Sequence, residues 1–256
     1  MNTATTTSTS RLAPLAGLRI AVTGGTSGLG LALVRALQAQ GARVAFVARD
    51  AERVRRTAIE WPGTHGIVGD VARKDDTHRI ALQINAALGG LDVLINNASS
   101  LGPVPLALLA DTECEDLEAA LAANLLGPFR LTKALLGSLT ASARERDATA
   151  LVVNISSDAA VTPYPGWGAY GASKAALRHL SAIWNEELAE HRVRTVSPDP
   201  GDMDTPLHAL AVPDADPATL KRPADAAHQL LALIAREIGA RPAIDIDHHA
   251  ATKALA

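Results

Sequence analysis

The sequence predicts an α/β protein, a doubly wound parallel sheet of the Rossmann fold with helices on both faces. Short apolar runs alternate with helical patterns along most of the chain, as in repeated strand–helix–strand units. The strand runs are almost continuously apolar, so helices are expected to cover both faces in three α/β/α layers. A glycine-rich turn between the first strand and the first helix is typical of the same fold class.

Six strands and the helices between them can be placed from these patterns. The strand runs are residues 18–22, 42–47, 66–69, 91–95, 150–155 and 192–196, and a short last strand is expected at 243–246. The helical patterns cover residues 31–40, 51–60, 75–88, 112–121 and 169–190, with a longer helix to about residue 140 that Asn124 opens or interrupts. Right-handed crossovers place the carboxyl ends of all strands at one edge, where ligands bind in such folds. The residues that directly follow strands, and are therefore expected to converge there, are Thr23, Arg49, Asp70, Asn96, Ser157 and Pro200.

Composition narrows the class of protein. The chain has 256 residues, 48% of them apolar, and a net charge of −3, so no basic bias indicates binding to nucleic acid or to a membrane surface. The single cysteine, Cys114, excludes an internal disulfide and a cysteine-based zinc site, and it fits a reducing compartment such as the cytoplasm. Residues 1–14 are expected to form a disordered tail, and residues 15–256 a single domain. The Asp and His residues at 245–249 are interpreted as a solvated tail rather than a metal site.

The turn after the first strand is a candidate nucleotide site. Its glycines would let the backbone approach a pyrophosphate, and the following helix offers free N–H groups at its N-terminus. The alternative is a tight turn that serves only helix packing. The cofactor-binding residues expected in this turn are Thr23, Gly24, Thr26, Ser27, Gly28, Leu29 and Gly30.

The segment from Asn154 to Lys174 carries the expected chemistry. Lys174 lies four residues after Tyr170, on the same face of a helix, and an ammonium there would lower the tyrosine pKa from about 10. Tyr170 would then exchange protons near neutral pH, and Ser157 would hold a substrate oxygen beside it. The alternative is that Tyr170 and Lys174 are an ordinary pair on a helix surface.

Several motifs, in order, resemble those of the classical short-chain dehydrogenase/reductase family over residues 18–205. They are Thr23-Gly24-x-x-x-Gly28-x-Gly30, Asn96-Asn97-Ala98, Asn124, Ser157, Tyr170-x-x-x-Lys174, and Pro200-Gly201 with Thr205. The resemblance implies that Tyr170 is the catalytic acid/base, that Lys174 lowers its pKa and binds the nicotinamide ribose, that Ser157 polarises the carbonyl, and that Asn124 holds a proton-relay water. It also implies that the cofactor contacts Asp70, Val71, Asn97, Ala98, Pro200, Gly201 and Thr205 in addition to the glycine turn. A homodimer or homotetramer is implied as well.

The resemblance also guides the choice of cofactor. The position that carries aspartate in NAD-preferring members is Ala48 here, and the next residue is Arg49, whose planar cation suits a 2′-phosphate. Asp50 is interpreted as the N-cap of the following helix. NADP(H) is therefore the expected cofactor, with NAD(H) as the alternative if Asp50 serves the ribose instead.

Some residues depart from the family pattern or lie outside it. Ser99 stands where the family has glycine, and Pro198 adds a proline before Pro200. Residues 202–222 are expected to bind a small carbonyl or alcohol substrate through the apolar residues Met203, Leu207, Leu210, Val212 and Leu220, with Trp167 at the mouth. The expected function is NADP(H)-dependent oxidoreduction. A catalytically silent nucleotide-binding regulator and a sugar-nucleotide epimerase are the alternatives, and the short stretch after Thr205 disfavours the epimerase.

Overall fold

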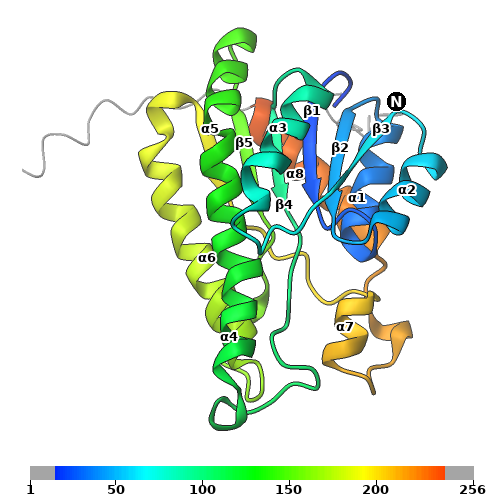
Figure 1. Ribbon diagram of the computed structural model, residues 1–256, viewed down its shortest axis with the longest axis vertical. Helices are drawn as coiled ribbons and strands as arrows, with labels where there is room; N and C mark the ends of the chain where they lie inside the picture. The colour runs from blue at the N-terminus through cyan, green and yellow to red at the C-terminus, as the bar shows by residue number, and fades with distance from the viewer. Residues whose placement is uncertain (1–14, 240–256) are drawn as a thin grey trace, which may run out of the picture.

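The computed structural model describes residues 15–239 and contains a wholly parallel six-stranded sheet in the order β3-β2-β1-β4-β5-β6 (Figure 1). The strands are β1 (Arg19–Thr23), β2 (Arg43–Ala48), β3 (Thr64–Val68), β4 (Val93–Asn96), β5 (Ala150–Asn154) and β6 (Val193–Val196). The order reverses between β1 and β4, which confirms the doubly wound arrangement and places a ligand crevice beyond these two strands. The tail expected at 1–14 and the strand expected at 243–246 lie outside the described residues.

Eight α-helices occur in the described part of the chain. They are α1 (Gly28–Ala39), α2 (Ala51–Glu60), α3 (Asp76–Leu88), α4 (Cys114–Leu121), α5 (Gly127–Arg146), α6 (Gly168–Glu187), α7 (Pro206–Ala211) and α8 (Pro223–Gly239). Short 3₁₀ turns lie at Leu109–Asp111, Asp158–Ala160, Ala189–His191 and Pro217–Thr219. The first helix begins three residues earlier than the sequence predicts, so the last part of the glycine motif forms its first turn. None of the helices within residues 15–239 is long and apolar enough to cross a membrane.

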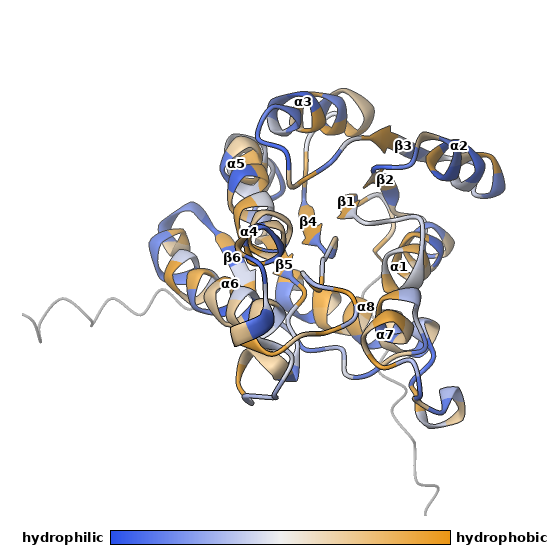
Figure 2. Cartoon of the chain, turned by 60° about the horizontal axis from the view of Figure 1, so that its bottom comes forward, coloured by the Kyte–Doolittle hydropathy of each residue, from blue (hydrophilic) through white to orange (hydrophobic). Residues whose placement is uncertain are grey.

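Two hydrophobic clusters sandwich the sheet. On one face, α1 and α8 pack against alternate strand residues such as Val22, Phe46 and Val153. On the other face, α3 and α5 pack against the intervening residues, such as Ala21 and Val152. Figure 2 shows the strands between these two groups of helices, which confirms the three predicted layers.

Sequence analysis predicted neither α7 nor α8, since its last helical pattern ends at residue 190. Helix α8 is the longer of the two. Its buried residues follow the spacing of a helix that packs on one side: Ala226, Ala227, Leu230, Leu231, Ile234 and Ala235. Pro223 stands at its first position, where the missing N–H costs no hydrogen bond. This spacing was the available signal, and the helix completes the cover over β1 and β5 beside α1.

The expected interruption at Asn124 has a definite form. Residues Ala122–Leu126 adopt π-helical geometry between α4 and α5, so the two helices follow one another with one wide turn between them. Such turns hold an extra residue and are frequent at functional sites. The wide turn presents Asn124 to the protein interior, where the residue is fully buried.

Asp92, immediately before β4, ties three elements together at the amino end of the sheet. Its carboxylate accepts hydrogen bonds from the backbone N–H of Arg19 (2.7 Å), from the Arg19 guanidinium and from the hydroxyl of Ser142, and it pairs with Arg146 at 3.2 Å. Burial alone would raise the pKa of Asp92, but hydrogen bonds from Arg19 and Ser142 outweigh it and lower the pKa to about 2.

We predict that Asp92→Asn lowers the free energy of unfolding at pH 7 by about 1–2 kcal/mol, after allowance for solvent screening. The folded-state pKa of Asp92 lies below its ordinary value of 3.8, so its contribution is complete above pH 4 and disappears as the pH falls through 2. Urea unfolding should therefore show a smaller difference in the free energy of unfolding between variant and wild type near pH 2 than at pH 7. Asp225→Asn, which removes an exposed pair with Arg222, is the matched control and should change the free energy of unfolding much less, because solvent screens an exposed ion pair. A difference for Asp92→Asn that stays constant with pH would contradict this account.

Candidate active site

A large cavity of about 1050 Å³ opens at the carboxyl ends of the strands. Its walls come from the turn after β1, the ends of β2 and β3, the loops after β4 and β5, the start of α6, and the segment leading into α7. Of the residues expected to converge, Arg49, Asp70, Ser157 and Pro200 line it. Asn96 does not, because its amide is buried and bonds to Asn154 (2.7 Å) and Thr132 (3.3 Å).

The glycine turn forms one end of the cavity and is held from beneath by Thr23. The buried Thr23 hydroxyl accepts the backbone N–H groups of Asn97 and Ala98, both at 3.0 Å, and the Asn97 amide donates to the Thr23 carbonyl at 2.8 Å. Thr23 therefore fixes two loops against each other and does not itself line the cavity, whereas the predicted residues Gly24, Thr26, Ser27, Gly28, Leu29 and Gly30 do.

Two glycines in this turn cannot be replaced without strain. Gly24 has φ of +71°, in the left-handed region, and a Cβ there would lie 2.9 Å from the Asn97 amide nitrogen. A Cβ at Gly30 would collide with the Gly24 carbonyl oxygen. Helix α1 begins beside them after Ser27, whose side chain makes no capping hydrogen bond, so the first N–H groups of α1 are left for a ligand.

The end of β2 brings basic side chains to the same end of the cavity. Arg49 lines it, and Asp50 caps α2 by accepting the backbone N–H of Arg53 at 3.0 Å, as the sequence predicts. Arg53 also lines this wall and was missed by sequence analysis. The available signal was its place in the first turn of α2, four residues after Arg49.

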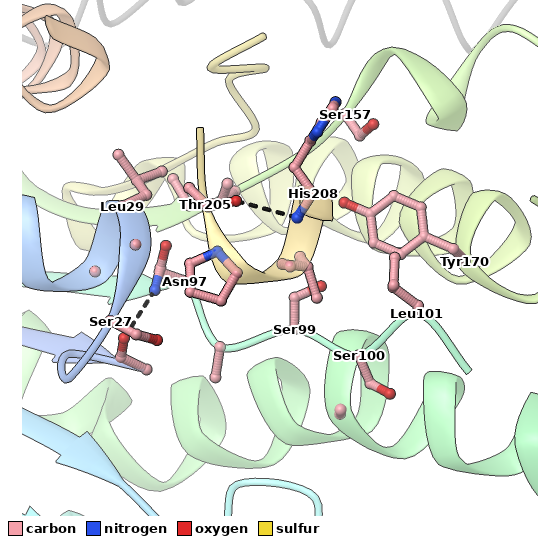
Figure 3. Close-up of a pocket in the computed structure, with 18 of the residues that line it drawn as sticks. Ser27, Leu29, Asn97, Ser99, Ser100, Leu101, Ser157, Tyr170, Thr205 and His208 are labelled. Carbon is pink, nitrogen blue, oxygen red and sulfur yellow. Dashed lines mark hydrogen bonds between the residues drawn. The ribbon is translucent and has the colours of Figure 1, made fainter. Parts of the chain in front are cut away.

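The remaining expected cofactor contacts also line the cavity: Asp70, Val71, Asn97, Ala98, Pro200, Gly201 and Thr205. The Asp70 carboxylate accepts the N–H of Ala72 at 3.0 Å, which fixes the turn after β3. The carbonyl of Pro200 accepts a hydrogen bond from Lys221 at 2.7 Å, and Thr205 caps α7 by accepting the N–H of His208 at 3.2 Å (Figure 3).

Tyr170, Ser157 and Ser99 meet at the other end of the cavity. Tyr170 comes from α6 and is only 8% exposed, Ser157 follows β5, and Ser99 follows β4 (Figure 3). Both serine hydroxyls lie near enough to the Tyr170 hydroxyl to lower its pKa. Ser157 and Tyr170 thus lie at one end of the cavity, and Ser99 places a second hydroxyl at the same end.

The pKa of Tyr170 is opposite in direction to the expectation. Burial raises it to about 12, the nearby hydroxyls of Ser157 and Ser99 act in the opposite direction, and the charges of Asp199 and Asp158 raise it further. Spacing alone led to the expected decrease, because it does not show how deeply the phenol is buried. In this structure Tyr170 is protonated at neutral pH.

Lys174 lies on the same face of α6 as Tyr170, as the spacing predicts, but it does not bond to the tyrosine hydroxyl. Its ammonium lies 5.5 Å from the centre of the Tyr170 ring and donates to the Ile155 carbonyl at 2.7 Å. Burial lowers the pKa of Lys174 to about 8, and Asp199 partly opposes this decrease.

Asn124 is fully buried and does not line the cavity, and its amide bonds only to protein groups. Its oxygen accepts the Ser99 hydroxyl (3.0 Å) and the Ser100 N–H (2.8 Å). Its nitrogen donates to the Ser100 carbonyl (2.7 Å) and the Ser173 hydroxyl (2.8 Å). The side chain therefore joins the loop after β4 to α6, one turn beyond Tyr170.

The space around Tyr170 has mostly apolar walls and a few carboxylates. Leu101, Trp167, Leu207, Leu210 and Val212 line it, which agrees with the expected substrate segment, whereas Leu220 does not. Sequence analysis missed Asp158 and Tyr164, which also line it and bond to each other at 2.8 Å. Within residues 15–239, no group of three His, Cys, Asp or Glu side chains is placed to hold a metal ion.

Comparison with known proteins identifies the family of this chain. The family model described as short chain dehydrogenase matches residues 19–216. Serine 3-dehydrogenase of Agrobacterium fabrum is 34% identical over 188 residues, which cover 73% of this chain and 72% of the relative. A short chain dehydrogenase of Shigella flexneri complexed with NADP superposes with a TM-score of 0.78 at 26% identity, covering 87% of this chain and 92% of that one. A 3-ketoacyl-(acyl-carrier-protein) reductase of Brucella melitensis complexed with NADH gives 0.78 at 25% identity, covering 84% and 90%.

Proposed function

Because this chain belongs to the short-chain dehydrogenase family and is a nicotinamide-dependent oxidoreductase acting on CH–OH or carbonyl groups, we propose that Tyr170 is its acid/base and NADP(H) its preferred cofactor. The observation that carries the proposal is one cavity with a glycine turn at one end and Tyr170 with Ser157 at the other. A phosphate-bearing cofactor and a proton-exchanging group would thus face the same space.

The residues at the glycine end fit such a cofactor. Gly24 and Gly30 keep the backbone free of side chains where a pyrophosphate would approach, and the N-terminus of α1 offers N–H groups. Thr205, Pro200 and Val71 line the cavity farther along. When bound, the nicotinamide supplies or accepts the hydride, and the protein supplies the proton and the binding groups.

Tyr170 is proposed to give its hydroxyl proton to the substrate oxygen during carbonyl reduction and to take it back during alcohol oxidation. Its raised pKa keeps it a proton donor at neutral pH, which favours reduction, and higher pH favours oxidation. Ser157 is proposed to donate a hydrogen bond to the same substrate oxygen as negative charge develops there. Lys174 is proposed to place a cation under the Tyr170 ring and to bind the nicotinamide ribose.

A catalytically silent nucleotide-binding regulator is the alternative. Such a protein would have no need of a buried tyrosine, a serine and a buried lysine at one end of the cavity, and these groups favour the enzyme. The apolar walls support a small carbonyl or alcohol substrate with a hydrophobic carbon skeleton. The domain is proposed to span residues 15–256, with substrate bound mainly by residues 202–222. The free thiol of Cys114 supports a cytoplasmic location.

Tyr170→Phe is expected to lower kcat by about 100-fold or more while NADPH still binds, because the ring remains and only the proton-exchanging group is removed. Turnover is measured with a panel of ketones and aldehydes, and NADPH binding by its fluorescence. Near-normal turnover in this variant would remove Tyr170 from the mechanism. Binding of NADPH by the wild type without turnover of any substrate would favour the regulator.

Arg49→Ala is expected to weaken NADPH about tenfold or more and to leave NADH nearly unchanged, because only NADPH carries a 2′-phosphate for the guanidinium to bind. Arg53→Ala should weaken NADPH in the same selective way. Arg56→Ala is the matched control, since Arg56 is an exposed arginine of α2 that does not line the cavity. Dissociation constants for both cofactors decide the matter. The assignment fails if the wild type prefers NADH, or if Arg49→Ala loses both cofactors equally.

A homodimer or homotetramer is expected, built on α5 and α6, where Phe129 and Trp184 stack at 5.3 Å between the helices and remain partly exposed. Light scattering at micromolar protein concentration is expected to give two or four times the chain mass. A monomer would contradict the assembly but not the chemistry.

A further inference from the structure

Asp158 places a carboxylate directly beside Ser157, at the end of the cavity where Figure 3 shows Ser157 and Tyr170. The Ser157 hydroxyl donates to one carboxylate oxygen at 3.0 Å, and the backbone N–H of Ala159 donates to the same oxygen at 2.7 Å. The Tyr164 hydroxyl donates to the other oxygen at 2.8 Å. The carboxylate is therefore held in place next to the group proposed to bind the reacting oxygen.

The charge of Asp158 has no cationic partner in the described part of the chain. Its three donors are neutral groups, and no described Lys, Arg or His side chain forms an ion pair with it. The basic side chains of Arg49 and Arg53 line the other end of the cavity, with the glycine turn. The buried ammonium of Lys174 donates to the Ile155 carbonyl instead. The Asp158 carboxylate is therefore available to a cationic group of a ligand.

Ser157 gives its only hydrogen to Asp158 in this structure. The proposed function needs the same hydrogen at the substrate oxygen, where negative charge develops. Turning the hydroxyl away breaks a charge-assisted hydrogen bond and leaves that carboxylate oxygen with only the Ala159 N–H. A donor on the substrate that replaces the serine hydrogen at Asp158 would remove this cost.

The spacing of the two side chains shows where that donor must lie. Ser157 Oγ and Asp158 Oδ1 are 3.0 Å apart. Two polar groups on neighbouring carbon atoms of a small molecule are separated by a similar distance, so a substrate oxygen bound to Ser157 places the neighbouring group beside Asp158. An ionised carboxylate only accepts hydrogen bonds, and an ammonium supplies both the donors and the opposite charge.

Asp158 also opposes the chemistry at Tyr170 unless its charge is neutralised. Burial raises the pKa of Tyr170, and the charges of Asp199 and Asp158 raise it further, so they disfavour the phenolate that forms when the proton leaves. A cation bound to Asp158 would cancel its part of this effect. A cationic substrate would thus help the proton transfer as well as bind.

We propose that Asp158 determines specificity by binding an ammonium group on the carbon atom next to the reacting carbon, so that the substrate is an amino alcohol or the matching amino ketone. The proposal rests on the proposed function, in which Ser157 and Tyr170 bind the reacting oxygen. The ammonium replaces the Ser157 hydrogen at Asp158, the Ser157 hydroxyl turns to the substrate oxygen, and no covalent bond changes in this step. The apolar side chains of Trp167 and Leu207 contact the rest of the carbon skeleton.

The test compares alcohols that differ only in the group next to the reacting carbon. One set is isopropanolamine, propylene glycol and isopropanol, which carry an ammonium, a hydroxyl and a hydrogen there at neutral pH. A larger set is phenylpropanolamine with its diol and simple-alcohol analogues. For each, kcat/KM of oxidation is measured with NADP⁺ and with NAD⁺. The variants are Asp158→Asn, which keeps the shape and removes the charge, and Asp111→Asn. Asp111 is the matched control, because it is an exposed aspartate in another 3₁₀ turn and does not line the cavity.

In the wild type, kcat/KM for the ammonium member of a set is expected to exceed that for the other two members by about tenfold or more, because its hydrogen bond to Asp158 is charge-assisted. Asp158→Asn should remove this preference, and Asp111→Asn should keep it. Tyr164→Phe should weaken the preference less than Asp158→Asn, because the charge remains and only one of the bonds that hold the carboxylate is lost.

Equal kcat/KM for the three members in the wild type overturns the proposal, as does a preference that survives Asp158→Asn or is lost equally in Asp111→Asn. A preference for the hydroxyl member overturns it as well and assigns Asp158 to a diol. Binding is also measured by ligand-observed NMR in Tyr170→Phe with NADP⁺ or NAD⁺ present, which separates binding from turnover. If the wild type turns over no alcohol or ketone, the proposed function fails. Tighter binding of isopropanolamine than of isopropanol, abolished by Asp158→Asn, would still support the ammonium site, and equal binding would overturn it.

Discussion

The buried amide of Asn124 is the interaction on which the arrangement of the reacting groups depends. Its four hydrogen bonds use both the oxygen and the nitrogen, and they join the loop after β4 to the first turns of α6. Ser99 is held by the first of these elements and Tyr170 by the second. A buried amide with every partner in place is rigid, because losing one bond would leave a polar group unpaired away from water. The positions of Ser99 and Tyr170 are therefore set by a residue that does not face the cavity.

At the end of the cavity that holds Tyr170, burial disfavours the charged forms of the ionisable side chains. Tyr170 and Lys174 are both buried, and in each case burial shifts the pKa against the charged form, to about 12 and about 8. A dry site strengthens hydrogen bonds to a developing charge, but it also makes that charge costly to form. The hydroxyls of Ser157 and Ser99 near Tyr170 and the charge of Asp199 near Lys174 partly offset this cost.

Local patterns predicted most of the fold and many of the site residues, whereas the energetics needed the three-dimensional structure. The apolar runs placed all six strands, and the cap at Asp50 and the spacing from Tyr170 to Lys174 follow from short-range geometry alone. The pKa of Tyr170 was wrongly predicted because it depends on how far packing removes the phenol from water. The bond between Ser99 and Asn124 joins residues 25 apart in sequence, and no local pattern indicates it. Helix α8 was not predicted, although its buried apolar residues follow helical spacing.

The number of residues in the π-helical turn at Ala122–Leu126 matters for the structure as much as their identity does. An α-helix advances by about 100° per residue, so removing one residue from the wide turn would rotate everything on one side of it relative to the other. The protein could then no longer bury both Asn124 and the apolar side of α5, which carries Leu131, Leu135 and Leu139. The extra residue allows α5 to pack on the sheet while the Asn124 amide still points toward the active site. Deleting one residue here would therefore disturb either the packing of α5 on the sheet or the position of Asn124.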